Sequence, residues 1–265
     1  MTVARTFGLE KWYCDCVGAD GSVAIGYWAS LQWKGLALTW EQITVFPPEG
    51  APRQRSALTG DAAPLVAGSL VRWDAPGIGV RYEAARTIQP LDELLLETEE
   101  GTVRWRVEAP AARVTLAQDG DVPFEGTGYV ERLSMTVPPW ALPLKELRWG
   151  RWISTDRSRS VVWIDWRGKA PKVWAYLDGQ RLHEATVTDE GVRAPGVTLT
   201  LDPGRTLIAH ALDEVVARIP PLRPLVPVSL LQLRQDTRLS VGRLSGEGAS
   251  ESVTGTAVHE LVVLP

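Results

Sequence analysis

Ser22-Val23-Ala24-Ile25-Gly26-Tyr27-Trp28 has a counterpart later in the chain, Ser160-Val161-Val162-Trp163-Ile164-Asp165-Trp166. A second stretch, Ala75-Pro76-Gly77-Ile78-Gly79-Val80, corresponds to Ala194-Pro195-Gly196-Val197-Thr198-Leu199. The two pairs occur in the same order and are separated by 138 and 119 residues. A repeat of this length indicates a duplicated domain, because the unit of a solenoid is only about 20–50 residues long.

A third pair of segments completes the repeat near the end of each half. Gly126-Thr127-Gly128-Tyr129-Val130-Glu131 corresponds to Gly255-Thr256-Ala257-Val258-His259-Glu260, 129 residues later. The chain of 265 residues is therefore predicted to contain two copies of a module of roughly 130 residues, a normal size for one domain. We assign residues 1–137 to the first module, residues 138–146 to a proline-rich linker and residues 147–265 to the second module.

The repeated segments have the pattern of β-strands. Val23–Trp28, Val161–Trp166 and Val197–Leu201 are short runs of alternating or wholly apolar residues. Turn-forming residues follow at intervals of about ten residues, which is typical of antiparallel sandwiches and barrels. Helical periodicity is scarce, and a stretch such as Leu91–Glu99 shows it only weakly. The sequence therefore predicts an all-β fold of two similar antiparallel β-barrels or sandwiches in tandem, with a few short helices.

Composition argues against several classes of partner. The net charge is −4 and the chain has no basic run, which disfavours binding to nucleic acid or to anionic membranes. The segment Met1–Thr6 lacks the apolar core of a signal peptide, and no uninterrupted apolar stretch approaches the length of a membrane span. We therefore expect a soluble, cytoplasmic protein without membrane insertion, and the sequence leaves its oligomeric state open.

The cysteines and histidines do not form a recognisable metal site. Cys14 and Cys16 lie two residues apart on a predicted strand, and His183, His210 and His259 are widely scattered. A disulfide between residues i and i+2 would be strained, so two buried or half-buried thiols are the favoured interpretation. The chain also has no nucleotide-binding loop and no Ser–His–Asp motif. We expect neither a metal nor a cofactor.

Tryptophan is unusually frequent, with twelve residues against only three phenylalanines. Large rings at alternating strand positions either fill a core or line a cavity for a long apolar ligand. The sequence leaves both interpretations open.

The segments around the junction of the two halves carry a resemblance to a known family. They are Gly126–Arg132, Pro138–Leu144 and Leu147–Trp152. This pattern resembles the carotenoid 1,2-hydratases (hydroxyneurosporene synthases) and related lipocalin-like proteins. These have a Gly-x-x-Tyr/Trp-x-Asp strand, a Pro-Leu spacer and a Trp-x-Trp-x-Arg strand. The resemblance implies two lipocalin-like (calycin) antiparallel β-barrels in tandem, a fold to which fungal Diels–Alder enzymes that close decalin rings are also similar.

The chain departs from the hydratases at one motif. They usually continue the first strand as Asp-x-Asn/Glu-Trp, whereas this chain has Glu131-Arg132-Leu133-Ser134. The acidic position is kept as glutamate, but the Asn-Trp pair is not. The resemblance thus implies the fold, an apolar pocket and one or two acids rather than carotenoid hydration itself.

Asp165 is the stronger candidate for a catalytic acid, because its counterpart in the first repeat is Tyr27. A carboxyl group beside an indole in a dry barrel has a raised pKa and can protonate a double bond. The mechanism implied by the resemblance would use Asp165 in this way. The alternative is an exposed strand aspartate beside Arg167 or Arg151.

Glu131 is the second candidate acid, and it corresponds to Glu260 in the other half. Residues kept in both halves serve the scaffold more often than the chemistry, and a buried carboxylate needs a partner. We expect each glutamate to pair with the arginine of its own module, Glu131 with Arg86 and Glu260 with Arg205.

The predicted binding site lies at the junction of the halves and in the mouth of one barrel, where ligand sites concentrate. The residues 46–66 form a long loop that could cover it. The predicted substrate-binding residues are Tyr27, Trp28, Tyr129, Trp149, Trp152 and Trp163.

Two classes of function follow. The first, favoured here, is a cofactor-independent enzyme, a lyase or isomerase, that hydrates, cyclises or isomerises a long hydrophobic polyene or isoprenoid in a Trp-lined pocket. The second is a non-catalytic lipid or pigment carrier of the lipocalin type. A pericyclase acting on a polyketide is a further alternative, because it needs shape and stacking, with or without one hydrogen-bond donor, but no acid.

Overall fold

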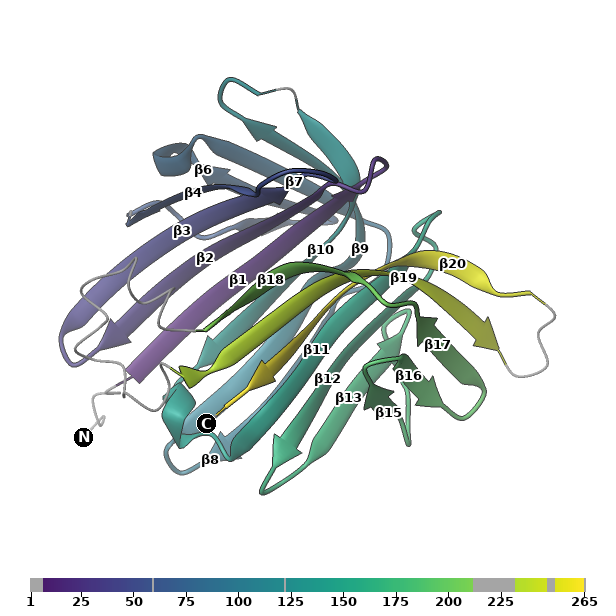
Figure 1. Cartoon of the computed structure of the whole chain (residues 1–265). Coiled ribbons are helices and arrows are strands. Elements are labelled where there is room, and N and C mark those ends of the chain that lie inside the picture. The colour runs from purple at the N-terminus through teal and green to yellow at the C-terminus, as the bar shows by residue number, and fades with distance from the viewer. Residues whose placement is uncertain (1–6, 59, 122, 212–231, 247–250, 265) are drawn as a thin grey trace. The chain divides into compact units, whose positions relative to one another are not determined.

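The computed structural model describes residues 7–58, 60–121, 123–211, 232–246 and 251–264. The fold is all-β and consists of two curled antiparallel sheets of ten strands each, or half-barrels (Figure 1). Among the described residues there is no helix of seven residues or more. The predicted all-β class and the internal duplication are confirmed.

The first sheet contains ten strands and one 3₁₀ turn. They are β1 (Phe7–Gly18), β2 (Val23–Trp33), β3 (Leu36–Phe46), β4 (Arg53–Leu58), β5 (Leu65–Ala67), β6 (Leu70–Ala75), η1 (Pro76–Ile78), β7 (Val80–Arg86), β8 (Leu91–Thr98), β9 (Gly101–Gln118) and β10 (Phe124–Met135).

The second sheet follows a 3₁₀ turn, η2 (Pro139–Ala141). Its strands are β11 (Leu144–Ser154), β12 (Ser160–Gly168), β13 (Lys172–Leu177), β14 (Gln180–Arg181), β15 (Thr186–Thr188), β16 (Gly191–Ala194), β17 (Val197–Leu201), β18 (Arg205–Ala211), β19 (Arg234–Gly246) and β20 (Val253–Val263).

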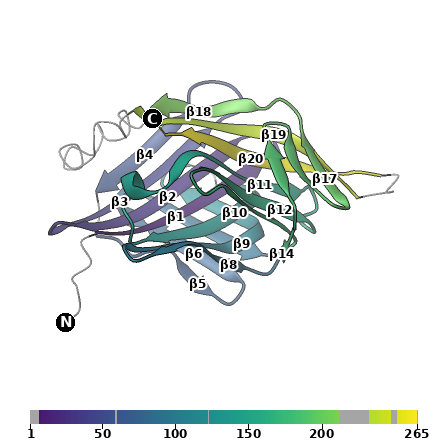
Figure 2. The ribbon, with the colours of Figure 1, turned by 90° about the horizontal axis from the view of Figure 1, so that it is seen from below.

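Both sheets have the same strand order. The first runs β4-β3-β2-β1-β10-β9-β7-β6-β5 with β8 paired to β9, and the second runs β14-β13-β12-β11-β20-β19-β17-β16-β15 with β18 paired to β19. In each sheet the first and last strands are neighbours, β1 beside β10 and β11 beside β20 (Figure 1, Figure 2). The two sheets thus share one topology, as expected from the sequence repeat.

The chain divides into two compact units, Met1–Pro139 and Trp140–Pro265. Strand β11 begins at Leu144, so the last residues of the stretch assigned to a linker already belong to the second sheet. The weakly helical stretch from Leu91 forms strand β8 instead of a helix. The expected long loop at residues 46–66 contains β4 and the first residues of β5.

Tryptophan mainly fills the interior, since nine of the twelve are buried. In the first sheet Trp12, Trp28 and Trp73 belong to one apolar cluster with Cys14 and Cys16, both of which are free and buried thiols. That bears out the expectation of two buried thiols.

The second sheet has its own core around Trp152 and Trp163. Trp152 is fully buried, and its indole N–H donates to the carbonyl oxygen of Gly242 at 3.1 Å. Such a bond satisfies a polar atom that burial has removed from water. No helix among the described residues is long and apolar enough to cross a membrane.

A glycine on β11 decides how closely β12 packs against it. Gly150 pairs with Trp163, and a Cβ atom at Gly150 would overlap the indole ring and approach Cβ of His259 to 2.8 Å. Gly150→Ala should therefore lower the free energy of unfolding by about 1–3 kcal/mol, measured by urea denaturation. Gly8→Ala is the matched control, because a Cβ there meets nothing within 4 Å; equal effects of both changes would show that Trp163 does not occupy this space.

Candidate functional site

Charged side chains gather on the concave face of the second sheet, near one end of β11, β12 and β20. Arg148 pairs with Asp165 on one side and with Leu261 on the other. Directly paired residues project to the same face of a sheet. These three side chains therefore lie on the face that also carries Trp163 and Trp152, the core of this unit.

One step further along the same face lies a histidine. His259 pairs with Gly150 on β11 and with Arg238 on β19. Because Gly150 has no side chain, the ring of Trp163 and the Cβ atom of His259 occupy the space above it. Strand pairing thus places a titratable ring beside an indole and a guanidinium.

These residues line a pocket that lies entirely within the second unit. Its lining consists of Arg148, Trp149, Trp163, Thr188, Asp189, Asp236, Arg238, His259, Glu260 and Leu261. The indole of Trp163 and the side chain of Leu261 supply apolar wall on the face that carries Arg148 and His259, whereas Trp149 and Glu260 pair with each other and project to the opposite face. Such a pocket suits a compact molecule that carries both an apolar body and polar groups.

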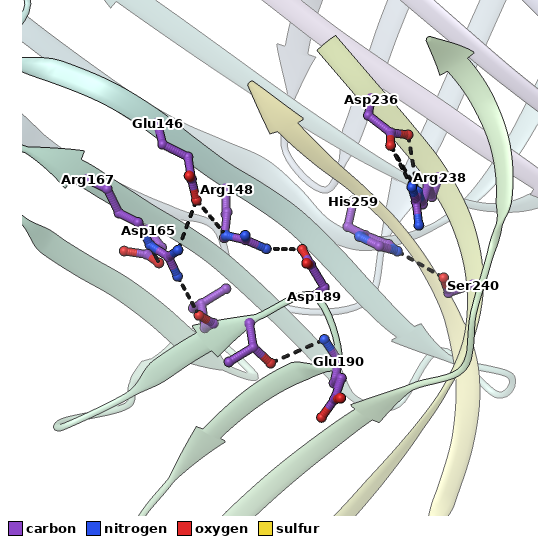
Figure 3. Close-up of polar contacts among 12 residues, drawn as sticks. Glu146, Arg148, Asp165, Arg167, Asp189, Glu190, Asp236, Arg238, Ser240 and His259 are labelled. Carbon is purple, nitrogen blue, oxygen red and sulfur yellow. Dashed lines mark hydrogen bonds and ion pairs between the residues drawn. The ribbon is translucent and has the colours of Figure 1, made fainter. Parts of the chain in front are cut away.

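A chain of ion pairs holds one wall of the pocket (Figure 3). Arg148 donates through Nε to Oε1 of Glu146 at 2.9 Å and through Nη1 to Asp189. Arg167 donates to the same Glu146 oxygen at 2.9 Å and through Nε to Oδ2 of Asp165 at 2.7 Å. Arg148 and Arg167 both donate to the carboxylate of Glu146, and this shared partner restricts the rotamers of both arginines, so this wall is rigid.

The opposite wall carries the histidine. His259 Nε2 lies 2.9 Å from Oγ of Ser240, which is buried (Figure 3). Burial and, to a smaller extent, the charge of Arg238 lower the pKa of His259, while Asp189 and Asp236 act in the opposite direction, and the net result is a pKa of about 4. At neutral pH the imidazole is therefore uncharged and keeps one nitrogen as an acceptor.

The structure distributes the predicted residues of the second half around this pocket. Trp149 and Trp163 line it. Trp152 lies in the core, where Gly242 accepts its N–H. Asp165 is buried and paired with Arg167, so the partner foreseen in the alternative interpretation is present although the aspartate is not exposed.

The structure brings three predicted residues of the first half together on the other face of the first sheet. Glu131 Oε2 accepts hydrogen bonds from Tyr129 at 2.7 Å and from Trp105 at 2.5 Å. The ring of Tyr13 contacts those of Tyr27 and Tyr129.

The arginine expected beside Glu131 lies elsewhere. Arg86 donates to the backbone carbonyl of Glu108 at 3.3 Å, so the predicted pair with Glu131 is wrong. Tyr129 and Trp105 donate hydrogen bonds to the Glu131 carboxylate. In the second half Glu260 accepts from Gln235 and Thr237, and its pairing with Arg205 stays a prediction.

The strand pairing also corrects the counterpart of Asp165. Tyr27 contacts Tyr13 on one face of the first sheet, whereas Trp28 belongs to the core cluster on the other face. Asp165 lies on the concave, core-bearing face, five residues after the start of β12 at Ser160, as Trp28 lies five residues after the start of β2 at Val23. The structural counterpart is therefore Trp28, one residue away from the one inferred from the repeat.

His259, Arg148 and Arg238 are site residues that sequence reasoning missed. One signal was available for the histidine, because the third repeat block places Val130 at the equivalent position. A polar residue in one copy at the position of a core valine in the other indicates that this position has a role other than core packing. The arginines gave no such signal, since charged residues on strands are usually exposed.

The fold of this chain is similar to that of several proteins of known structure. CghA, solved alone and with Sch210972, aligns with a TM-score of 0.59 and 12% sequence identity over 98% of this chain and 89% of that one. Kievitone hydratase from Nectria haematococca aligns with a TM-score of 0.55 and 9% identity, covering 97% and 89% of the two chains.

A putative AttH from Nitrosomonas europaea aligns with a TM-score of 0.52 and 11% identity, covering 98% of this chain and 93% of that one. No family model and no curated protein sequence matches this chain. At identities this low, the likeness shows a shared fold.

The lowered pKa of His259 has a measurable consequence. Titration of the His259 imidazole by NMR should give a midpoint at about pH 4, well below the ordinary value of 6.5. Because the unfolded state binds a proton between pH 6.5 and pH 4 and the folded state does not, stability should fall as the pH falls through this window. His259→Gln should remove that part of the pH dependence. A midpoint near 6.5 would contradict the buried, uncharged imidazole.

Proposed function

We propose that the protein is a cofactor-independent enzyme of the hydratase type that acts on a small oxygenated organic molecule at the pocket of the second unit. The observation that carries the proposal is an uncharged imidazole, His259, placed between Trp163 and Arg238 in a pocket. An enzyme that adds or removes water needs a group that accepts a proton and returns it, and histidine is the usual choice.

The pocket lining favours a substrate with a polar group. Arg148 and Arg238 supply cationic donors, and the indole of Trp163 supplies a flat apolar surface. An unsubstituted polyene would displace water from those charged groups and offer them no hydrogen bond in return, which costs free energy. An unsaturated molecule with a carbonyl or phenolic oxygen would use both kinds of wall. The shared fold with kievitone hydratase supports a hydratase reaction.

The chemistry can be written with side chains alone. Water attacks the carbon–carbon double bond of an unsaturated carbonyl compound, and its proton passes to the free nitrogen of His259. Arg148 or Arg238 stabilises the charge that develops on the carbonyl oxygen. The imidazolium then returns the proton to the neighbouring carbon, so that the elements of water are added and the enzyme is regenerated.

Asp165 has a different role in this proposal from that of an isolated acid. Its Oδ2 is occupied by the guanidinium of Arg167, which also holds Glu146 and through it Arg148. We assign Asp165 as a positioning residue that fixes the arginine wall. Glu131 belongs to the other unit and is already bound by two aromatic donors.

Two other functions would use the same pocket. A carrier would bind the same class of molecule without changing it. A pericyclase would use the uncharged His259 as a hydrogen-bond donor to a carbonyl group, and the low pKa of the ring keeps it uncharged at neutral pH. The isotopic composition of the product separates all three.

The test is incubation of the purified protein with a panel of unsaturated carbonyl compounds in water labelled with oxygen-18. A hydratase gives a product that contains the label, a pericyclase gives a rearranged product without label, and a carrier returns the compound unchanged although it binds. Either of the last two results would overturn the hydratase proposal.

Variants then assign the residues. His259→Gln should lower kcat by about 10²–10⁴-fold with bound substrate retained, because it removes the proton acceptor. Asp165→Asn should mainly raise KM, since it loosens the arginine wall without touching the reacting atoms. His183→Gln is the matched control, because His183 is exposed and outside the pocket. Unchanged kcat in His259→Gln would exclude the imidazole from the chemistry.

A further inference from the structure

A carboxyl group lies inside the first sheet, far from any role in the proposed reaction. Glu41 on β3 is fully buried. It pairs with Trp28 on β2 and with Ala57 on β4, and both neighbours pack in the apolar cluster of the first unit. A glutamate at such a position has lost its hydration.

The bonding of Glu41 does not compensate for that loss. Its Oε1 accepts one long hydrogen bond from the indole N–H of Trp73 at 3.4 Å. Its Oε2 is buried and receives no hydrogen bond from an N–H or hydroxyl group of the described residues. The nearest cation along β4 on the same face is Arg55, which donates to the backbone carbonyls of Ile78 and Asp119.

A second acid, Asp61, interacts with Glu41 from the segment between β4 and β5. Asp61 lies between β4 and β5, in residues 60–64. Trp28 donates its indole N–H to the backbone carbonyl of Asp61 at 3.2 Å, and the amide of Gly77 donates to Oδ2 of Asp61 at 3.1 Å. These two bonds hold residues 60–64 against the first unit.

Burial raises the pKa of Glu41 to about 7, Trp73 lowers it somewhat, and the charge and a hydrogen bond of Asp61 raise it. Two carboxyl groups can hydrogen-bond only when one of them carries a proton. The titratable group that faces Glu41 is thus Asp61, while Trp28, Trp73 and Ala57 complete its surroundings.

The second sheet shows that the fold does not need this carboxyl group. Trp28 corresponds to Asp165, and Asp165 pairs with Val173 where Trp28 pairs with Glu41. The equivalent of Glu41 is therefore a valine, an ordinary strand residue. An uncompensated acid in one copy and a valine in the other point to a role beyond packing.

We propose that Glu41 and Asp61 form a proton-dependent latch that holds residues 60–64 against the first sheet. With one proton between the two carboxyl groups, the segment is held by their hydrogen bond together with those from Trp28 and Gly77. Without it, two carboxylates face each other in an apolar surrounding, and the segment opens so that water reaches Glu41. The latch is independent of the proposed function.

The direction of the pH effect follows from linkage. The closed form keeps its proton up to about pH 7, whereas in the open form Glu41 loses it near the ordinary value of 4.5. The open fraction should therefore rise about tenfold per pH unit between these two values and level off above about pH 7.

Hydrogen exchange reads the latch at two defined atoms. The indole N–H of Trp28 and the amide of Gly77 should lose protection as the pH rises from about 4.5 to about 7, after correction for intrinsic exchange rates. In Glu41→Gln and Glu41→Val the corrected protection should be independent of pH. Glu49→Gln, an exposed glutamate before β4, is the matched control and should keep the wild-type profile.

A direct titration guards against a variant that fails to fold. The carboxyl carbon of Glu41 in the unaltered protein should titrate by NMR with a midpoint near pH 7, and Asp61→Asn should move that midpoint downward. A midpoint near 4.5 in the unaltered protein, or protection of Trp28 and Gly77 that does not change with pH, would overturn the proposal.

Discussion

The double pairing of β11, with β12 on one side and β20 on the other, is the constraint on which the candidate site depends. Side chains alternate between the two faces of a strand, so a slip of one residue would move Arg148 to the opposite face and separate it from Asp165. The close contact between Gly150 and the ring of Trp163 opposes such a slip, because only a residue without a side chain leaves room for this ring. Register, rather than any single contact, thus assembles the pocket.

The two copies keep one topology and have diverged on their concave faces. In the first, the equivalent positions hold Trp28 and Glu41, and in the second they hold Asp165 and Val173. Each copy therefore has a buried carboxyl group at these positions, on neighbouring strands and in different surroundings. The first is enclosed by indoles and a second acid, whereas Arg167 binds the second. Duplication left the backbone hydrogen bonds fixed and allowed the enclosed chemistry to change.

Much of the fold was predictable from the sequence, because the alternation in Val23–Trp28 and its recurrence report strands and duplication directly. The weak helical period after Leu91 was misleading, since this stretch pairs with β9 and long-range pairing overrides local preference. The equivalence of Asp165 with Tyr27 was wrong by one residue because the two hairpin turns differ in length, and sequence matching ignores which face a residue occupies. The pocket itself depends on strands far apart in the chain, and no local pattern places Arg148 beside Asp189.

The curled sheets are open, and their outermost strands have a consequence for how the protein behaves at high concentration. An exposed sheet edge is a template on which another molecule can add a strand and begin to aggregate. Of the four strands at the ends of the two strand paths, three, β5, β14 and β15, have only two or three residues. The fourth, β4, is longer but carries Arg53 and Arg55. Short or charged edges of this kind discourage pairing between the sheet edges of different molecules. The protein can therefore resist aggregation in a crowded solution although its sheets are not closed.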